Sequence, residues 1–421
     1  MSFFPSGFHA AERRRTPWGK HPYTLEFHRG WEAVSALESA WRRLTQIHPD
    51  PAPCISWEAV NALQEVGLRR STPLVVGLRM DGRLEAIFPF SARSWVGGIH
   101  MRFLGARLLH RHEPLVAPRV RALPAAPILK RIARKLGRGV LYDLAGLTPE
   151  GFGADWLRQS LSSTPGWYSA QGAREATISV AGGWEAVHVT VPQSLRRAAR
   201  EARERARHQG DYRLAMVDGA RKYLEQLLSL ATRQGGFARS RPGRVLFALL
   251  RGAVEQGRIL LATAHLGEEL AAGSAVWIAS GRAVELFATE SAELVRFAPA
   301  KVLRVALLEH LAELEGVEQF RLPPGHAGQT SDLSPIPQYQ ERFWGAPFPG
   351  PARIAAQLGG WYSRHHLLRE SPLDRALRIL RPGQAGRAGR TEAIPGGAPA
   401  ERATGATKEA AMAETSETIQ V

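Results

Sequence analysis

Two hairpin patterns that repeat at a fixed spacing constrain the fold of this chain more than any other feature. In PLVVGLRMDGRLEAIFPF, Asp81-Gly82 separates two runs rich in β-forming residues, which is a strong hairpin signal. The segment RILLATAHLGEELAAGSAVWIASGRAVELFATE predicts three strands, with turns at Gly267-Glu268 and Ser280-Gly281. An offset of 186 residues aligns Leu84 with Leu270. The spacing favours a duplicated domain, and two unrelated α+β domains are the alternative.

Strand and helix patterns surround both hairpins. From apolar periodicity and turn residues we expect strands at 23–27, 140–147, 211–217 and 317–322, and helices at 31–44, 128–139, 221–233, 245–256 and 299–314. This order predicts an α/β (α+β) chain in which each half has a mixed, mostly antiparallel sheet flanked by helices.

Length and composition set the expected number of domains. The chain has 421 residues, of which 44% are hydrophobic, and a single core seldom serves more than about 250–300 residues, so we expect two domains. Residues 381–421 are rich in Gly, Ala, Pro, Thr and Glu and predict a disordered tail, and residues 1–20 predict a flexible N-terminus. The single cysteine, Cys54, and the lack of a long apolar run indicate a soluble cytoplasmic protein without an internal disulfide.

The segment SLRRAAREARERARHQG, from Ser194 to Gly210, predicts a basic helix with one dry face. Apolar residues fall on one helical stripe and arginines on the next, namely Leu195, Ala199, Ala202 and Ala206 beside Arg196, Arg200, Arg203 and Arg207. Glu201 four residues before Arg205, and Glu204 four after Arg200, are expected to form ion pairs. The segment has no aromatic residues for base stacking, so despite the net charge of +16 a solvated helix face is preferred to a nucleic-acid arm.

The residues that follow carry a family resemblance. After S-L-R-R-x-x-R come a strand, a helix leading to QGGFARS (234–240), three strands and a helix that opens with FAPAKVL (297–303). This order, with the ending QYQERFWG (338–345), resembles the CelD-type acyltransferases of the GNAT superfamily, which are related to the tandem-GNAT aminoacyltransferases of peptidoglycan cross-bridges. Arg321 stands where the family has an aspartate. The resemblance implies tandem GNAT-like domains at 21–182 and 183–350, followed by an amphipathic helical extension at 351–380.

The same resemblance implies a binding loop for acetyl-CoA or another acyl-CoA. In the superfamily the diphosphate lies at the start of a helix, where unpaired N–H groups and the helix dipole favour anions. The corresponding residues here are Arg296, Phe297, Ala298, Pro299, Ala300 and Lys301, with proline in place of the first loop glycine. Proline suits a first helical position, and the two cations add positive charge. A plain helix start is the alternative.

Attack on a thioester also requires a proton acceptor within reach of the cleft. The candidates are Glu285 and Glu290 on the strand at 283–290, His265 on a nearby strand, and Tyr339 and His326 beside the expected cleft. On a regular strand the odd spacing of the two glutamates puts them on opposite faces, so at most one is expected to face the cleft. Ordinary solvated side chains are the alternative for each.

We expect no metal centre in this chain. His110, His112 and Glu113 form the cluster HRHE but lack a spaced further ligand, so a surface turn before Pro114 is the expected structure. The extension at 351–380 is expected to pack against the second domain, and peripheral contact with an anionic membrane is the alternative. His365-His366 is expected on its surface.

These observations predict an acyl-CoA-dependent N- or O-acyltransferase acting on a small molecule, sugar, or polysaccharide precursor of the cell envelope. Catalysis would use positioning, carbonyl polarisation by backbone donors and proton removal. One alternative is an aminoacyltransferase that takes its donor from aminoacyl-tRNA, which is the only nucleic acid expected as a partner. The other is a non-catalytic GNAT-fold component of an exopolysaccharide synthesis complex.

Overall fold

The computed structural model describes most of the chain between residues 23 and 365. The described residues are 23–48, 52–68, 71–95, 97–106, 108–109, 111–137, 139–147, 151–322 and 338–365. The chain divides into a unit of residues 1–378 and a unit of residues 379–421, and all elements below belong to the first unit. The N-terminus at 1–20 and the tail at 381–421 lie outside the described residues.

The described strands form one 13-stranded sheet. Neighbours run antiparallel except for β4 beside β6 and β11 beside β12, which confirms the mixed, mostly antiparallel architecture. Across the sheet the order is β1 (Thr24–Arg29), β2 (Thr72–Met80), β3 (Arg83–Trp95), β4 (Gly98–Phe103), β6 (Val140–Leu147), β13 (Gln338–Gly345), β7 (Trp167–Ser179), β12 (Gln319–Leu322), β11 (Arg282–Glu290), β10 (Glu269–Ala279), β9 (Ile259–Leu266) and β8 (Tyr212–Asp218), with β5 (Leu115–Val116) paired to β3. No helix in the described ranges is long and apolar enough to cross a membrane.

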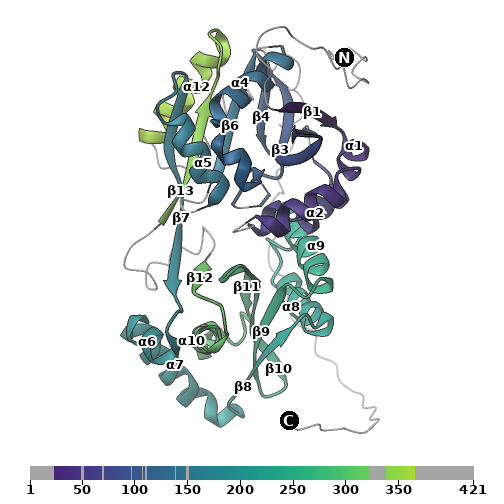
Figure 1. Ribbon diagram of the computed structural model, residues 1–421. Helices are drawn as coiled ribbons and strands as arrows, with labels where there is room; N and C mark the ends of the chain where they lie inside the picture. Colours follow the sequence, from purple (N-terminus) through teal and green to yellow (C-terminus); the bar gives the residue numbers. More distant parts are fainter. Residues whose placement is uncertain are drawn as a thin grey trace, which may run out of the picture. The chain divides into compact units, whose positions relative to one another are not determined.

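Strand β7 carries the sheet from the first half to the second (Figure 1). Its residues 167–175 pair with β13, and its residues 176–179 pair with β12. β13 also pairs with β6, so the strand that was expected to close the second domain lies inside the first-half sheet. With 13 residues, β7 is long enough to pair with a different strand at each end.

All three predicted turns are present, with Gly267-Glu268 between β9 and β10 and Ser280-Gly281 between β10 and β11. Asp81 and Gly82, between β2 and β3, have φ values of 49° and 77°, and Ser280 and Gly281 have φ values of 50° and 77°. Positive φ at both central residues matches the right-handed twist of paired strands, which explains why Asp-Gly and Ser-Gly occur there.

The hairpins also share a backbone irregularity at the same offset. Glu85 stands unopposed in β3 against β2, and Ala271 stands unopposed in β10 against β9. These bulged residues are 186 positions apart. Each bulge carbonyl accepts a hydrogen bond from a later loop, from Ala117 N at 2.8 Å and from Ser291 N at 2.7 Å. A shared bulge with a shared backbone contact supports the duplication.

Helices cover both faces of the first-half strands. α4 and α5 pack over Phe88 and Tyr142 on one face, and α2 and α3 pack over Val75 and Ile87 on the other. The first-half helices, including short 3₁₀ turns, are α1 (Trp31–Ser35), α2 (Glu38–Ile47), η1 (Pro53–Ile55), α3 (Trp57–Val66), η2 (Pro118–Ala122), α4 (Ala125–Lys135) and α5 (Phe152–Leu161).

The single helix expected at 31–44 is wrong, because the chain forms α1 and α2 there. The break falls at Ala36, whose N–H bonds to the carbonyls of Glu32 and Val34. Leu37 and Trp41 are nevertheless buried. The tight turn keeps the apolar stripe against the sheet, which is why the spacing looked continuous.

In the second half, α8 and α9 cover one face of the sheet, and α6, α7 and α10 lie on the other. Leu227 and Leu250 pack with Trp277 on the first face, while Leu307 packs with Val276 and Phe320 on the second. The elements are α6 (Gly183–Thr190), α7 (Gln193–Ala206), η3 (Arg207–Gln209), α8 (Arg221–Arg233), α9 (Arg241–Glu255), η4 (Val295–Phe297) and α10 (Pro299–Glu313).

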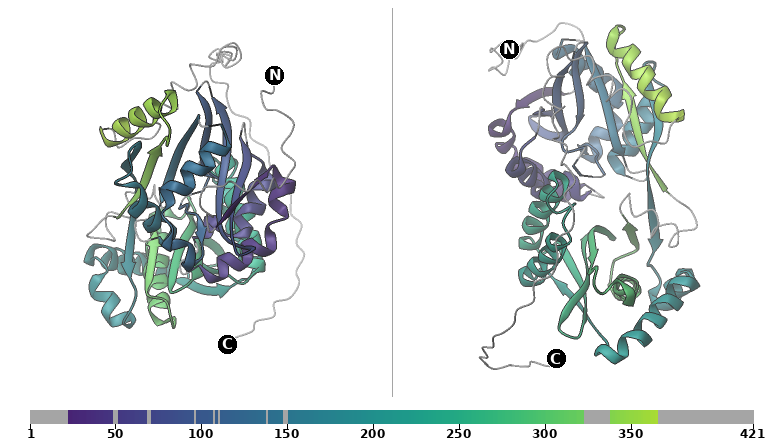
Figure 2. Two further views of the ribbon diagram at one scale, coloured as in Figure 1. Left: turned by 45° about the horizontal axis from the view of Figure 1, so that its top comes forward. Right: turned by 180° about the vertical axis from the view of Figure 1, so that it is seen from behind.

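The helix α12 (Pro351–His365) packs on the first half and not on the second domain, which corrects the expectation for this extension. Ala352 and Ala356 contact Leu141 and Trp344 in one buried cluster. Figure 2 shows α12 beside β13 in both views. Because β13 inserts between β6 and β7, the helix that follows it covers the same strands.

Candidate functional site

Two parallel strands separate in the second half. β11 and β12 pair through residues 282–284 and 319–321, and the described chain contains no later pair between them. β11 continues to Glu290 while its other edge stays paired with β10. Beyond Val284, no strand among the described residues pairs with the β12 edge of β11. α10 provides the connection between the two strands.

A bulge in β11 places both of its glutamates on the α10 side. Leu286 is the extra residue between the pairs formed by Glu285 and Phe287 with β10. A bulge shifts the alternation of side chains by one residue. Accordingly Glu285 contacts Arg304 of α10, and Glu290 contacts the start of the same helix. The expectation that at most one glutamate faces this side is wrong for that reason.

The segment predicted to bind a diphosphate forms the entry to α10. Ala298 adopts a left-handed conformation with φ 50° and ψ 50°, and Pro299 begins the helix. The preceding Phe297 is buried, and its carbonyl accepts a hydrogen bond from the Tyr212 hydroxyl at 2.9 Å. The Arg296 guanidinium lies 4.8 Å from the Phe297 ring centroid. These contacts hold the loop in place before the first helical turn.

Glu290 lies directly at this helix start. Ala300 N donates to Glu290 Oε2 at 3.4 Å, and Lys301 N donates to the Ala298 carbonyl at 3.1 Å. Burial raises the pKa of the Glu290 carboxyl, and the hydrogen bond from Ala300 and the charge of Lys301 oppose that effect. The Glu290 carboxylate therefore already accepts from the N–H group that an anionic ligand would use.

The other sequence-predicted residues lie elsewhere. Glu285 is buried, accepts from the Ser274 hydroxyl at 2.8 Å and pairs with Arg304 at 2.9 Å. His265 is on β9, with β10 between it and β11, and burial and Arg213 lower its pKa. The structure brings neither residue to the helix start.

The last two candidates come late in the chain. Tyr339 is on β13, where its backbone pairs with Arg174 of β7. His326 lies outside the described residues.

The arginine helix α7 packs against α10, as the alanine stripe predicted. Ala199 and Ala202 contact Val302, and Ala206 contacts Phe297. Most of the arginines on the predicted stripe are exposed. The ion pairs differ from those expected: Arg197 pairs with Glu201 at 2.7 Å. The end of a basic helix thus lies beside the loop that opens α10.

The surface turn expected for HRHE is wrong for residues 111–113, and His110 lies outside the described residues. Arg111, His112 and Glu113 are 4%, 2% and 1% exposed. Arg111 forms a two-point ion pair with Glu175 of β7, at 3.1 and 2.8 Å. The apolar residues Leu115 and Val116 of β5, which follow Pro114, are the signal that this segment enters the interior. Across the described ranges no cluster of three or more potential metal ligands occurs.

This segment fills the position in the first half where β4 and β6 separate. The parallel pair ends at Arg102 and Asp143. Beyond it, His112 N donates to the Gly146 carbonyl of β6 at 2.9 Å, and the His112 ring stacks on Phe103 at a centroid distance of 5.9 Å. In the order of elements, β4 and β6 of the first half correspond to β11 and β12 of the second half. In the first half, residues 111–113 fill the space beyond the last strand pair.

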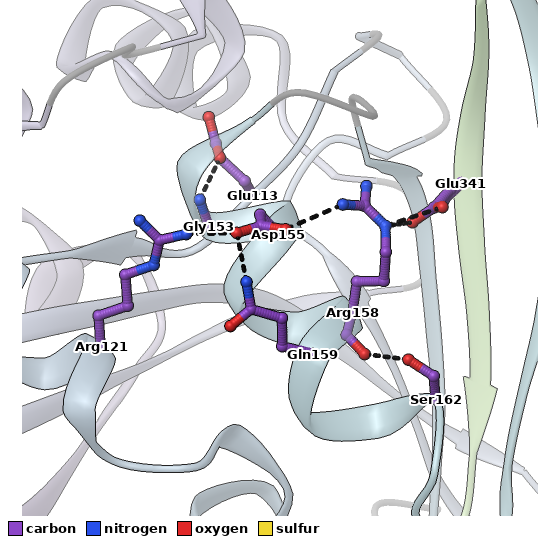
Figure 3. A network of polar contacts seen from close by, with 8 residues as sticks. All are labelled: Glu113, Arg121, Gly153, Asp155, Arg158, Gln159, Ser162 and Glu341. Atoms are coloured by element: carbon purple, nitrogen blue, oxygen red, sulfur yellow. Dashed lines mark hydrogen bonds and ion pairs between the residues drawn. The ribbon is translucent and has the colours of Figure 1, made fainter.

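Glu113 enters a polar network around the start of α5 (Figure 3). Gly153 N donates to Glu113 Oε2 at 2.7 Å. Further along α5, Arg158 bonds to both carboxylate oxygens of Glu341 on β13, at 3.0 and 2.9 Å, and to Asp155 at 3.1 Å. The network ties β13 to a first-half helix.

Comparison with known proteins agrees with this geometry. Residues 193–331 match the family model described as an acetyltransferase (GNAT) domain. Among solved structures, FemX is similar at 9% identity, with 73% of this chain and 95% of that chain covered and a TM-score of 0.51. A tandem GNAT protein from the clavulanic acid biosynthesis pathway is similar at 15% identity, with 78% and 100% covered and a TM-score of 0.38. No curated protein matches.

The separated parallel strands, the connecting α10 and the bulged β11 all lie within or directly beside the matched segment. Residues 193–331 are therefore similar to a GNAT acetyltransferase domain, and the first half repeats the order of its strands and helices.

Proposed function

We propose that the second half transfers an acyl group from an acyl-coenzyme A thioester to an amine or hydroxyl acceptor. The separation of β11 from β12 beside the start of α10 is the observation that carries this proposal. Beyond Val284 no described strand pairs with that edge of β11, and in the proposed mechanism its backbone N–H groups polarise the thioester carbonyl.

The start of α10 is suited to a phosphate group. Its Ala300 N–H already contacts an anion, the carboxylate of Glu290, which stands in for a phosphate oxygen. Lys301 and Arg296 add positive charge at the same loop, and would hold the diphosphate of acyl-coenzyme A. The bound donor supplies the thioester itself.

Glu290 remains the β11 candidate for proton removal, since Glu285 is engaged by Ser274 and Arg304. Glu290 is only half-buried and lies at the helix start. His265 and Tyr339 remain candidates of lower rank because both lie on strands other than β11 and β12.

The acceptor is proposed to be a sugar, or a polysaccharide precursor of the cell envelope. The resemblance to CelD-type acyltransferases supports this choice. The first half, whose own strand separation is filled by residues 111–113, would shape the acceptor side as a scaffold.

The position of α7 favours a second candidate donor, aminoacyl-tRNA. Its exposed arginines run toward Phe297, which its last residue, Ala206, contacts. A polyphosphate donor would gain attraction from such a face, and that attraction would weaken with salt. Glu290 at Ala300 favours a third candidate, a non-catalytic component of an exopolysaccharide synthesis complex, because it fills the anion position.

Isothermal titration of the full chain with acetyl-CoA tests the proposal. Wild-type protein should bind, and Lys301→Ala should weaken binding about tenfold, as expected for loss of one charged contact to phosphate. Lys222→Ala, an exposed lysine on α8, is the matched control and should bind as wild type does. If titration with acetyl-CoA gives no heat and the protein retains aminoacyl-tRNA on a filter in a salt-sensitive way, the donor is aminoacyl-tRNA and not acetyl-CoA.

A further inference from the structure

Five strands of the first half begin or end at the same end of the sheet. β3 ends where β4 begins, and β6 starts beside the first residues of β4. Gly345, the last residue of β13, pairs with Tyr142 near the start of β6 and with Trp167 at the start of β7. α4 leads into this end and α12 follows from it. We refer to it as the α12 end, the end of the first-half sheet at Gly98, Val140, Trp167 and Gly345.

The sequence around the α12 end is free of acidic residues. No Asp or Glu occurs in residues 93–112, 114–142, 159–174 or 342–369. Asp143, which follows the second of these ranges, is buried and pairs with Arg102 and Arg342, each at an N–O distance of 2.7 Å. This carboxylate is therefore already compensated and cannot neutralise cations on the surface.

α4 supplies exposed positive charge beside this end. Lys130, Arg134 and Lys135 are exposed and form no ion pair with any described residue. Arg134 and Lys135 lie in the last turn of the helix, directly before β6. The Lys130 ammonium lies 5.7 Å from the centroid of the Phe348 ring, so α4 meets the segment between β13 and α12. Figure 1 shows α4 and α12 at the same end of the first half.

α12 presents apolar side chains on the side that faces away from the sheet. Its inner side consists of small residues, and a Cβ atom at Gly359 would lie 2.8 Å from the Trp344 ring, so the helix lies close against the strands. On the outer side Ile354 and Leu358, one turn apart, are 61% and 54% exposed. Among the described residues no other helix carries two exposed large apolar side chains.

The sequence at the end of α12 has the same character. Residues 360–369 read GWYSRHHLLR, which combines Trp, Tyr and two leucines with two arginines. Aromatic residues beside basic ones are typical of segments that lie at the boundary between lipid headgroups and acyl chains.

We propose that the α12 end is a docking surface for a membrane that contains anionic phospholipids. Ile354 and Leu358 enter the headgroup boundary, and the α4 cations contact the lipid phosphates. A soluble polyanion would use the cations but leave the two apolar side chains in water. A second copy of this chain would bring like charges together. A membrane is the partner that satisfies both kinds of side chain. This inference does not depend on the proposed acyl transfer.

The test is flotation of the full chain with vesicles of phosphatidylglycerol and phosphatidylcholine in roughly a 1:2 ratio, against vesicles of phosphatidylcholine alone. Wild type should float with the anionic vesicles only, and less so as salt is added. The triple variant Lys130→Gln, Arg134→Gln, Lys135→Gln should bind about a hundredfold more weakly, since each basic residue near an anionic surface contributes about fivefold. The double variant Ile354→Ser, Leu358→Ser should bind about tenfold more weakly.

Two control variants make the same chemical changes elsewhere. Replacing Arg200, Arg203 and Arg207 of α7 by Gln removes three other exposed cations, and Ile47→Ser with Val189→Ser removes two other exposed apolar side chains. Both should bind vesicles as wild type does, and circular dichroism should show that all variants are folded.

Several results would overturn the inference. Wild type that does not float with anionic vesicles does so, as does an equal loss of binding in the control variants. If the Ile354→Ser, Leu358→Ser variant binds as wild type does, the cations alone act and the surface fits a soluble polyanion. If light scattering shows a dimer that this variant dissociates, the apolar face belongs to a second copy. Titration with acetyl-CoA tests the proposed function separately, so either proposal can fail without the other.

Discussion

Replacing Glu113 by glutamine should stabilise the protein at high pH relative to wild type. Burial raises the folded-state pKa of Glu113 to about 7, from an ordinary value of 4.5. The folded carboxyl thus binds its proton more tightly than the unfolded one does. Its contribution to stability is complete below about pH 4.5 and is lost as pH rises through about 7.

The size of the effect follows from that difference. Each pKa unit corresponds to about 1.4 kcal/mol, so ionising Glu113 in the folded state costs wild type about 3 kcal/mol by pH 8.5. Glutamine keeps an oxygen that can accept from Gly153 N and carries no charge to bury. The free energy of unfolding of Glu113→Gln, relative to wild type, should therefore rise by about 3 kcal/mol between pH 4.5 and pH 8.5.

Urea unfolding at several pH values, followed by tryptophan fluorescence, measures this difference. Glu85→Gln controls for the loss of a first-half carboxylate. If the difference between Glu113→Gln and wild type stays constant within about 0.5 kcal/mol over the whole range, Glu113 is not a buried ionisable group of raised pKa. The stability measurement needs no substrate, so it is independent of the proposed activity.

Two further substitutions test the contacts around the site. Tyr212→Phe removes the hydrogen bond to the Phe297 carbonyl and should cost about 1 kcal/mol, seen as a lower Tm together with weaker acetyl-CoA binding; unchanged binding would show that this bond does not hold the loop before α10. Arg111→Leu leaves Glu175 buried without its cation and should cost about 3–5 kcal/mol in urea unfolding, and the double variant with Glu175→Leu should recover much of it. A double variant no more stable than the single one would contradict that explanation.

Local signals in the sequence were enough to predict most elements of the second half. The Ser-Gly turn, the start of α10 at Pro299 and the dry alanine face of α7 all depend on residues close together in the chain. Turn chemistry, the fixed φ of proline and helical spacing act over a few residues, so they can be read before any packing is known.

The candidate site depended on contacts that no local pattern encodes. One extra residue in β11, Leu286, reversed the expected faces of Glu285 and Glu290. Because β7 is long enough to pair with two strands, β13 pairs with its first part and lies inside the first-half sheet. Neither a bulge nor a strand partner can be predicted from the periodicity of a single segment, because both depend on how a strand pairs with its neighbour.

The sequence by itself determined the duplicated hairpins, the class of fold and the position of the helix that opens at Pro299. Only the tertiary structure decided that residues 111–113 are buried and that Glu113 meets the start of α5. The reason is physical: a short polar segment next to a proline has the same local preferences on the surface as in the interior. What places it inside is the separation of β4 and β6, which must be filled by some part of the chain.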